Sequence, residues 1–306
     1  MNKHVRLFMA SCSAFALAGC APSESGETSS TIEPTIPVDV VVISGQSNAV
    51  GCSDYSYLYD TMGADKYREY ANDYPEIQIA FDSYTKDENK QFFSQNASPR
   101  ENFTDVKLGQ GNSTLTFGPE IGIAETLHER YANKLFLIKF ACGASNLKDD
   151  WMNKTSPMYP KMMDYIALQV QHLKAKGYIP TIRAFCWMQG EGDAWLNYYE
   201  TYFDNLSTFA ANVRADLRQY AGGKDVPFID AGISDSEQWQ YYREVNEAKV
   251  RFAALSDNNI YIDTIEEGLH THLEPTHNPD TAHYDSASMI ELGHLFANAF
   301  EPFLSK

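Results

Sequence analysis

Apolar runs of two kinds alternate along most of the chain. Short runs rich in β-branched or aromatic residues predict buried strands at 38–43, 76–81, 135–141, 181–188, 226–231 and 260–263. Apolar residues at helical spacing predict helices over 120–131, about 166–177, 199–217 and about 287–300. Alternating strands and helices are typical of an α/β fold with a mainly parallel sheet covered on both faces. Such a fold carries its functional groups at the carboxyl ends of the strands.

The stretch 52–116 departs from this alternation. It is rich in Tyr, Asn, Asp and Lys and, apart from 76–81, weakly periodic. Long loops in compact domains are usually functional or disordered. Because this one is rich in aromatic residues, we expect an ordered insertion near the functional site.

The first residues have the pattern of an export signal. Lys3 and Arg6 precede an apolar run over 7–18 that closes on L-A-G-C and is too short to span a bilayer. The ending resembles a bacterial lipoprotein box, with a signal at 1–19 and Cys20 as the lipidated residue. Ordinary cleavage nearby, with Cys20 incidental, is the alternative. We expect a protein exported across the inner membrane and anchored by lipid, facing the periplasm or the cell surface.

The remainder divides by composition. Residues 20–37 are rich in Ser, Thr, Glu and Pro and predict a flexible tether, followed by one large domain over 38–306. The net charge of −17 becomes −19 once Lys3 and Arg6 are removed with the signal. This charge repels nucleic acid and anionic lipid, so a neutral ligand is expected, and the lipid anchor is the only membrane contact.

Three cysteines lie in the predicted domain: Cys52, Cys142 and Cys186. Their odd number and spacing argue against a disulfide framework and against a cysteine zinc site. A bridge between Cys142 and Cys186 is compatible with an oxidising compartment, whereas buried free thiols are the simpler interpretation.

A possible nucleophile follows the first predicted strand directly. The segment V-V-V-I-S-G-Q-S-N places Ser47 at the mouth of a parallel sheet. Alone, Ser47 could equally cap the next helix. Near the other end, D-T-A-H places Asp280 three residues before His283, so the carboxylate can orient an imidazole that activates the serine.

Two further segments follow predicted central strands and offer hydrogen-bond donors. F-A-C-G-A-S-N contains Gly143, and W-M-Q-G-E-G-D contains Gln189. Together with the Ser47 amide, the Gly143 amide and the Gln189 side chain would form an oxyanion hole of three donors.

Five blocks in this order resemble the SGNH-hydrolase superfamily: G-Q-S-N, F-G-P-E (117–120), K-F-A-C-G-A-S-N-L (139–147), W-M-Q-G-E-G-D and D-T-A-H. More narrowly they are similar to its sialate O-acetylesterase and carbohydrate esterase family 6 (acetylxylan esterase) branch. The resemblance implies a flavodoxin-like three-layer α/β/α sandwich, no metal or other cofactor, and hydrolysis of O-acetyl groups on acetylated carbohydrate.

The same resemblance implies the roles of individual residues. Ser47, Asp280 and His283 would form the catalytic triad, with Ser47, Gly143 and Gln189 as oxyanion donors. Supporting positions would be Gln46, Asn48, Glu120 and Glu191, although Glu120 can also simply favour a helix dipole. The chain departs from the family where a second glycine is common, since Ala144 follows Gly143. We expect His283 to titrate near or below neutral pH.

Alternatives remain. Glu191 and Asp193 could act as the paired carboxylates of a glycoside hydrolase. His270, His272 and His277 could join His283 in a metal site, although surface polarity is the simpler interpretation. A non-catalytic carbohydrate-binding surface lipoprotein is a third possibility. Trp151, Trp195 and the tyrosines of 55–74 are candidates to stack on sugar rings or to pack in the core.

Overall fold

The computed structural model describes residues 35–99 and 102–305. The predicted signal, Cys20 and most of the predicted tether lie outside the described residues and stay predictions. In the described part, no helix is both long and apolar enough to cross a membrane.

A central sheet organises the described residues. Its strands run in the order β10-β9-β8-β1-β7-β3-β4, with β5 paired to β3. They are β1 (Ile36–Gly45), β3 (Tyr74–Lys86), β4 (Phe92–Ala97), β5 (Thr104–Val106), β7 (Leu135–Gly143), β8 (Tyr178–Met188), β9 (Phe228–Ala231) and β10 (Asn259–Ile262). All neighbouring pairs are parallel except those of β3 with β4 and with β5. A small second sheet pairs β2 (Ser53–Asp54) with β6 (Thr116–Phe117).

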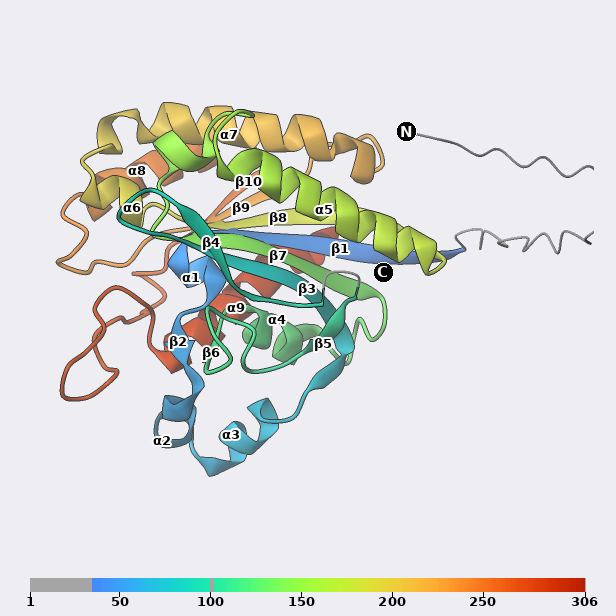
Figure 1. Ribbon diagram of the computed structural model, residues 1–306, viewed down its shortest axis with the longest axis horizontal. Helices are drawn as coiled ribbons and strands as arrows, with labels where there is room; N and C mark the ends of the chain where they lie inside the picture. Colours follow the sequence, from blue (N-terminus) through green and yellow to red (C-terminus); the bar gives the residue numbers. More distant parts are fainter. Residues whose placement is uncertain (1–34, 100–101, 306) are drawn as a thin grey trace, which may run out of the picture. The chain divides into compact units, whose positions relative to one another are not determined.

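Helices cover both faces of this sheet (Figure 1). The longer ones are α4 (Glu120–Leu127), α5 (Met158–Ala175), α7 (Tyr202–Leu217), α8 (Tyr242–Ala253) and α9 (Ser286–Phe300). In Figure 1, α5, α7 and α8 lie on one side of the sheet, and α4 and α9 pack together on the other. The short helices are α1 (Ser47–Val50), α2 (Leu58–Met62), α3 (Ala64–Tyr70) and α6 (Glu191–Trp195). The predicted three-layer α/β/α architecture is confirmed.

The six predicted strands are all present, and the differences lie mainly in what surrounds them. The predicted helix at 120–131 ends at Leu127, and α5 begins at Met158, before its predicted start. Helix α8 and strands β4 and β5 were not predicted. Within 52–99 and 102–116, the described parts of the insertion, β3 joins the central sheet and β4 forms its edge.

The three cysteines of the domain, Cys52, Cys142 and Cys186, are free. Cys142 on β7 and Cys186 on β8 are fully buried in the core on either side of β1, where they act as small apolar side chains. The bridge between Cys142 and Cys186 is therefore not formed, and the interpretation as free thiols is confirmed.

Candidate active site

The chain order places β1 at a switch point of the sheet. From β1 the chain crosses to β3, returns to β7 beside β1, and from β7 crosses to β8 on the other side of β1. Ligands of such sheets bind in the crevice outside the strand ends at this point. Ser47 follows β1, Gly143 ends β7 and Gln189 follows β8. The three predicted segments therefore meet at one edge.

Gly45 explains how the first strand ends. Its φ is +142°, and a Cβ built there would lie 1.9 Å from the carbonyl oxygen of Met188. Only glycine allows β1 to approach β8 this closely. The tight approach turns the chain sharply, and Ser47 begins α1 two residues later.

Asp280 and His283 form the predicted pair. Oδ1 of Asp280 accepts hydrogen bonds from the backbone N–H groups of Ala282 (2.9 Å) and His283 (3.3 Å), which holds the carboxylate in a local turn. Oδ2 is then left for Nδ1 of His283, at 2.6 Å. The other ring nitrogen, Nε2, is the one available to a serine.

Ser47 and His283 line the same cavity, whose volume is about 510 Å³. Its other lining residues come from five segments: Gln46, then Lys86, Asp87, Glu88 and Lys90 of the β3–β4 turn, Ala144, then Gly192, Trp195 and Leu196, and finally Gln238 and Trp239. The nucleophile and base proposed from the sequence are thus brought together although they lie at opposite ends of the domain.

The electrostatics of the pair differ from the sequence-based expectation. Burial lowers the pKa of His283, but the hydrogen bond with Asp280 and a contact with the Cys52 side chain outweigh burial and raise it to about 10. At Asp280, burial raises the pKa, but the interaction with His283 keeps the pKa below its usual value. The expectation that His283 titrates near or below neutral pH is therefore wrong, because it ignored these two partners.

Gly143 leaves space open beside the nucleophile. A Cβ at this position would lie 3.9 Å from the Ser47 Cβ and 3.5 Å from Oγ1 of Thr85. The next residue, Ala144, has a φ of +57°, in the left-handed region. The turn thus keeps a conformation that suits the glycine common in the family, although the glycine itself is missing.

Gln189 is less available than predicted. Its side chain is fully buried, and Nε2 donates to Oδ2 of Asp193 (2.6 Å) and to Oε1 of Gln46 (3.1 Å). Both N–H bonds of the amide are engaged, so oxyanion donation by Gln189 would require one of them to be released. Gln46 also accepts from the backbone of Gly190 and Gly192, and it reaches the cavity.

Asn48 connects the serine segment to the histidine segment. Its Oδ1 accepts from the backbone N–H of Tyr284 at 3.0 Å, and its Nδ2 donates to Oε1 of Glu191 at 2.8 Å. Oγ of Ser53 donates to the carbonyl of the same Tyr284 at 2.6 Å. The residue after His283 is therefore held on both sides by the segment that follows Ser47.

Glu120 does more than complement a helix dipole. Its Oε1 accepts from the backbone N–H of Gly118, and its Oε2 accepts from Nζ of Lys139 at 2.7 Å. Both side chains are fully buried, and burial lowers the pKa of Lys139. Lys139 also donates to the carbonyls of Val50 and Gln110, which fixes the end of α1 from below.

The carboxylates invoked for a glycoside hydrolase do not face the cavity. Glu191 and Asp193 are both fully buried and take hydrogen bonds from protein groups, Asn48 in one case and Leu147, Lys148 and Gln189 in the other. Burial raises the pKa of Glu191, and it raises that of Asp193 to about 6. These residues brace loops behind the site, so the glycoside hydrolase alternative is wrong.

The aromatic candidates separate by location. Trp151 is fully buried, donates to Ser145 and packs edge-on against Trp187, so it belongs to the core. Trp195 lines the cavity with 64 % of its surface exposed, and Trp239, which was not predicted, lines it too. Of the tyrosines in 55–74, Tyr57 lines a smaller cavity of about 200 Å³ that His283 also lines.

The sequence offered His270, His272 and His277 as possible metal ligands together with His283. The rings of His270 and His272 lie edge to face at 5.2 Å. Across the described ranges, no group of three or more His, Cys, Asp or Glu side chains is arranged to hold a metal ion.

Several lining residues escaped sequence reasoning. The residues of the β3–β4 turn could be placed only once β3 and β4 were known to pair as a hairpin. Gln238 and Trp239 lie in a loop whose sequence has no hydrophobic periodicity. That loop follows β9, so the rule that strand ends share one edge was the signal that could have found it. Gln238 also hydrogen-bonds Thr281, beside Asp280.

The match to known proteins covers this whole site. A family model described as carbohydrate esterase, sialic acid-specific acetylesterase, matches residues 37–301. The chain belongs to this family. The esterase is accordingly a carboxylic ester hydrolase of the carbohydrate acetylesterase class, as the sequence blocks indicated.

Solved structures share the esterase's fold at low sequence identity. A protein from Arabidopsis thaliana has a TM-score of 0.57 at 20 % identity, over 88 % of this chain and 100 % of its own. NanS has a TM-score of 0.58 at 15 % identity, over 89 % and 98 %. A carbohydrate acetylesterase from Xanthomonas citri has 0.53 at 15 %, over 87 % of this chain but only 56 % of its own. No curated protein matches the esterase in sequence.

Proposed function

We propose that the protein is a serine esterase that removes O-acetyl groups from carbohydrate. The observation that carries the proposal is the bond of 2.6 Å between Asp280 and Nδ1 of His283, in a histidine that lines the same cavity as Ser47. This arrangement fixes the tautomer whose Nε2 can accept the serine proton.

The chemistry proceeds in two displacements. His283 takes the proton of the Ser47 hydroxyl while Oγ bonds to the acetyl carbonyl carbon. The bond from that carbon to the sugar oxygen then breaks, and the sugar oxygen takes the proton from His283. A water next gives a proton to His283 and attacks the acetyl carbonyl carbon. The bond from that carbon to Oγ breaks, Oγ takes the proton from His283, and acetate is released with Ser47 restored. The backbone N–H groups of Ser47 and Gly143 are the candidates to stabilise the oxyanion.

The charges around the cavity favour a neutral sugar over a sialic acid. Lys86, Lys90 and His283, whose pKa is raised to about 10, are the lining cations, and Asp87 and Glu88 are lining anions. The charge of His283 is balanced by Asp280, which binds its Nδ1. Lys86 is moreover paired with both oxygens of Asp150, at 2.7 and 3.0 Å. A sugar carboxylate would therefore meet no excess of positive charge. We expect faster acetate release from acetylated xylan or mannan than from O-acetylated sialic acid, and the reverse preference would contradict this assignment.

Replacement of the nucleophile tests the serine mechanism. We expect Ser47→Ala to lower kcat for acetate release by about 10³-fold or more, because the remaining groups cannot form the acyl intermediate. Ser56→Ala, at an exposed serine outside the cavity, is the matched control and should keep full activity. A Ser47→Ala variant that folds and still turns over at the wild-type rate would refute the mechanism.

A further inference from the structure

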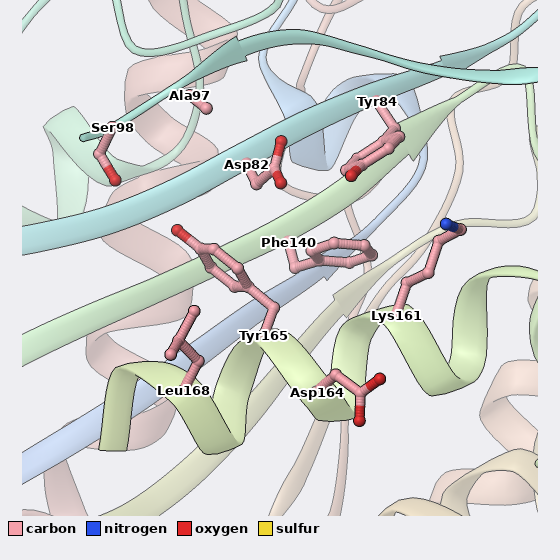
Figure 2. Close-up of a pocket in the computed structure, with 9 residues that line it drawn as sticks. All are labelled: Asp82, Tyr84, Ala97, Ser98, Phe140, Lys161, Asp164, Tyr165 and Leu168. Carbon is pink, nitrogen blue, oxygen red and sulfur yellow. The ribbon is translucent and has the colours of Figure 1, made fainter. Parts of the chain in front are cut away.

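A second hollow lies on the same side of the sheet as α5 (Figure 2). Helix α5 packs over β7 and β8, whereas β3 and β4 extend beyond it. The uncovered strip leaves a cavity of about 470 Å³ between the strands and the first half of α5. This volume is in the range that takes a small organic ligand.

Three aromatic rings form one side of this cavity. Phe140 on β7 is the buried floor, with the ring of Tyr84 at 5.3 Å and that of Tyr165 at 5.7 Å. Figure 2 shows Tyr84 and Phe140 on adjacent strands and Tyr165 reaching toward them from the helix. Such rings offer flat apolar surface with a hydroxyl at the edge.

Polar groups stand around the rings. Asp82 lies on β3, where its Oδ1 accepts from Oγ of Ser94 at 2.8 Å, and Lys161 and Asp164 lie on exposed positions of α5 at the rim. Carboxylates accept hydrogen bonds and an ammonium donates them, so the rim can bind several hydroxyl groups. Two acids and one base do not favour an anionic ligand, whereas rings combined with carboxylates suit the apolar faces and hydroxyls of a neutral sugar.

The cavity is a neighbour of the one that holds Ser47. Tyr84 lines the second cavity and Lys86 lines the first, two residues further along β3. Residues two apart point to the same face of a strand and lie about 7 Å apart. Lys86 is held by an ion pair with Asp150 at 2.7 Å.

We propose that this cavity is a subsite for unacetylated sugar units of an oligosaccharide whose acetylated unit sits at Ser47. The proposal rests on the proposed function. It makes the esterase selective for acetyl groups carried on a chain of neutral sugars, because units remote from the ester contribute binding.

Two variants test the proposal, one by filling the cavity and one by removing a polar group at its rim. Ala97 lines it at an exposed position, so Ala97→Trp should occupy the hollow, and Asp164→Ala should remove a rim acceptor. We expect each change to raise KM for acetylated xylohexaose at least tenfold and to leave kcat/KM for p-nitrophenyl acetate unchanged. Gln171→Ala, on an exposed position of the same helix, should change neither. Equal kinetics of the Ala97→Trp, Asp164→Ala and wild-type proteins on the hexaose would overturn the proposal.

A binding measurement separates failure of the subsite from failure of the function. Titration calorimetry would use the Ser47→Ala protein with unacetylated xylohexaose, mannohexaose and cellohexaose. We expect at least one to bind, and Ala97→Trp to weaken that binding at least tenfold. No binding of any of the three, or binding that Ala97→Trp leaves unchanged, would overturn the subsite even if acetate release from small esters is intact.

Discussion

Asn48 connects the segments of two residues that the proposed mechanism needs side by side. It follows Ser47 in the chain, and its Oδ1 accepts from the backbone of Tyr284, which follows His283. The side chain is fully buried, so neither Tyr284 N–H nor the Glu191 carboxylate has water to replace it. An amide at this position therefore ties the Ser47 segment to the His283 segment.

Asn48→Ala should separate this positioning role from simple packing. An unsatisfied buried group costs about 1–3 kcal/mol, so Tm should fall, and kcat should fall as the histidine segment shifts. Asn246 is a matched control, because it also bridges backbone groups, the N–H and C=O of Ile233, away from the triad. Asn246→Ala should lower Tm but keep kcat. Equal loss of kcat in both variants would contradict positioning by Asn48.

The pH dependence follows from the raised pKa of His283. The ring must be neutral to accept the serine proton, so a pKa of about 10 places the acidic limb of kcat/KM in alkaline solution. Activity should rise as the pH increases from 7 toward 10. Conversely, the stabilisation from this pair is present below the unfolded pKa of about 6.5 and is lost as the pH rises through 10.

Two variants check which contacts cause the shift. Asp280→Asn should move the limb to lower pH and also lower kcat, because the carboxylate no longer fixes the tautomer. Cys52→Ala should move the limb the same way and keep kcat, since Cys52 raises the pKa of His283 without belonging to the triad. If the acidic limb of kcat/KM lies at the wild-type pH in both variants, neither contact sets the pKa of His283.

At the scale of elements, the turn after β7 carries a measurable strain. Ala144 adopts a left-handed φ of +57°, which costs a residue with a Cβ about 1–2 kcal/mol more than glycine. Part of this difference is offset because glycine gains entropy in the unfolded chain. Ala144→Gly should therefore raise Tm by up to about 3 °C in thermal unfolding. Ala141→Gly, within β7 itself, should lower Tm, and a lower Tm for Ala144→Gly would contradict the strain.

The central strands could be predicted from the sequence because each is a buried, continuous apolar run. β1 and β7 have buried side chains along almost their whole length, which is the pattern of strands covered on two faces. β4 could not be predicted, because its residues alternate little and it exists only by pairing with β3. Helix α8 was missed since its polar residues hide a narrow apolar stripe.

The location of the candidate groups at one sheet edge was predictable where they follow a strand directly, as for Ser47 and Gly143. The Asp280–His283 pair was predictable from its short spacing, whereas buried contacts between distant segments were not. In the sequence, Lys139 is a single charged residue within an apolar strand. Its buried ion pair with Glu120 becomes visible only in the folded structure. The engagement of Gln189 by Asp193 and Gln46 is likewise invisible along the chain.

At the scale of the whole molecule, the net charge of −17 bears on substrate choice. A negative protein repels an anionic sugar, and added salt screens that repulsion. We expect kcat/KM for O-acetylated sialic acid to rise with ionic strength, whereas kcat/KM for a neutral acetylated xylo-oligosaccharide should stay flat. Kinetics from about 10 mM to 500 mM salt, at constant pH, measure this. If kcat/KM for O-acetylated sialic acid falls as salt is added, positive charge at the site attracts the anionic sugar and this expectation is wrong.

The bond from Asn48 to Tyr284 spans 236 positions of the sequence. Contacts of such separation form late, because a long loop must close before they stabilise anything. We therefore expect the proposed reaction at Ser47 to begin only once the last part of the polypeptide has docked. In refolding from denaturant, acetate release should recover after the tryptophan fluorescence of the core, so turnover itself reports the completion of folding.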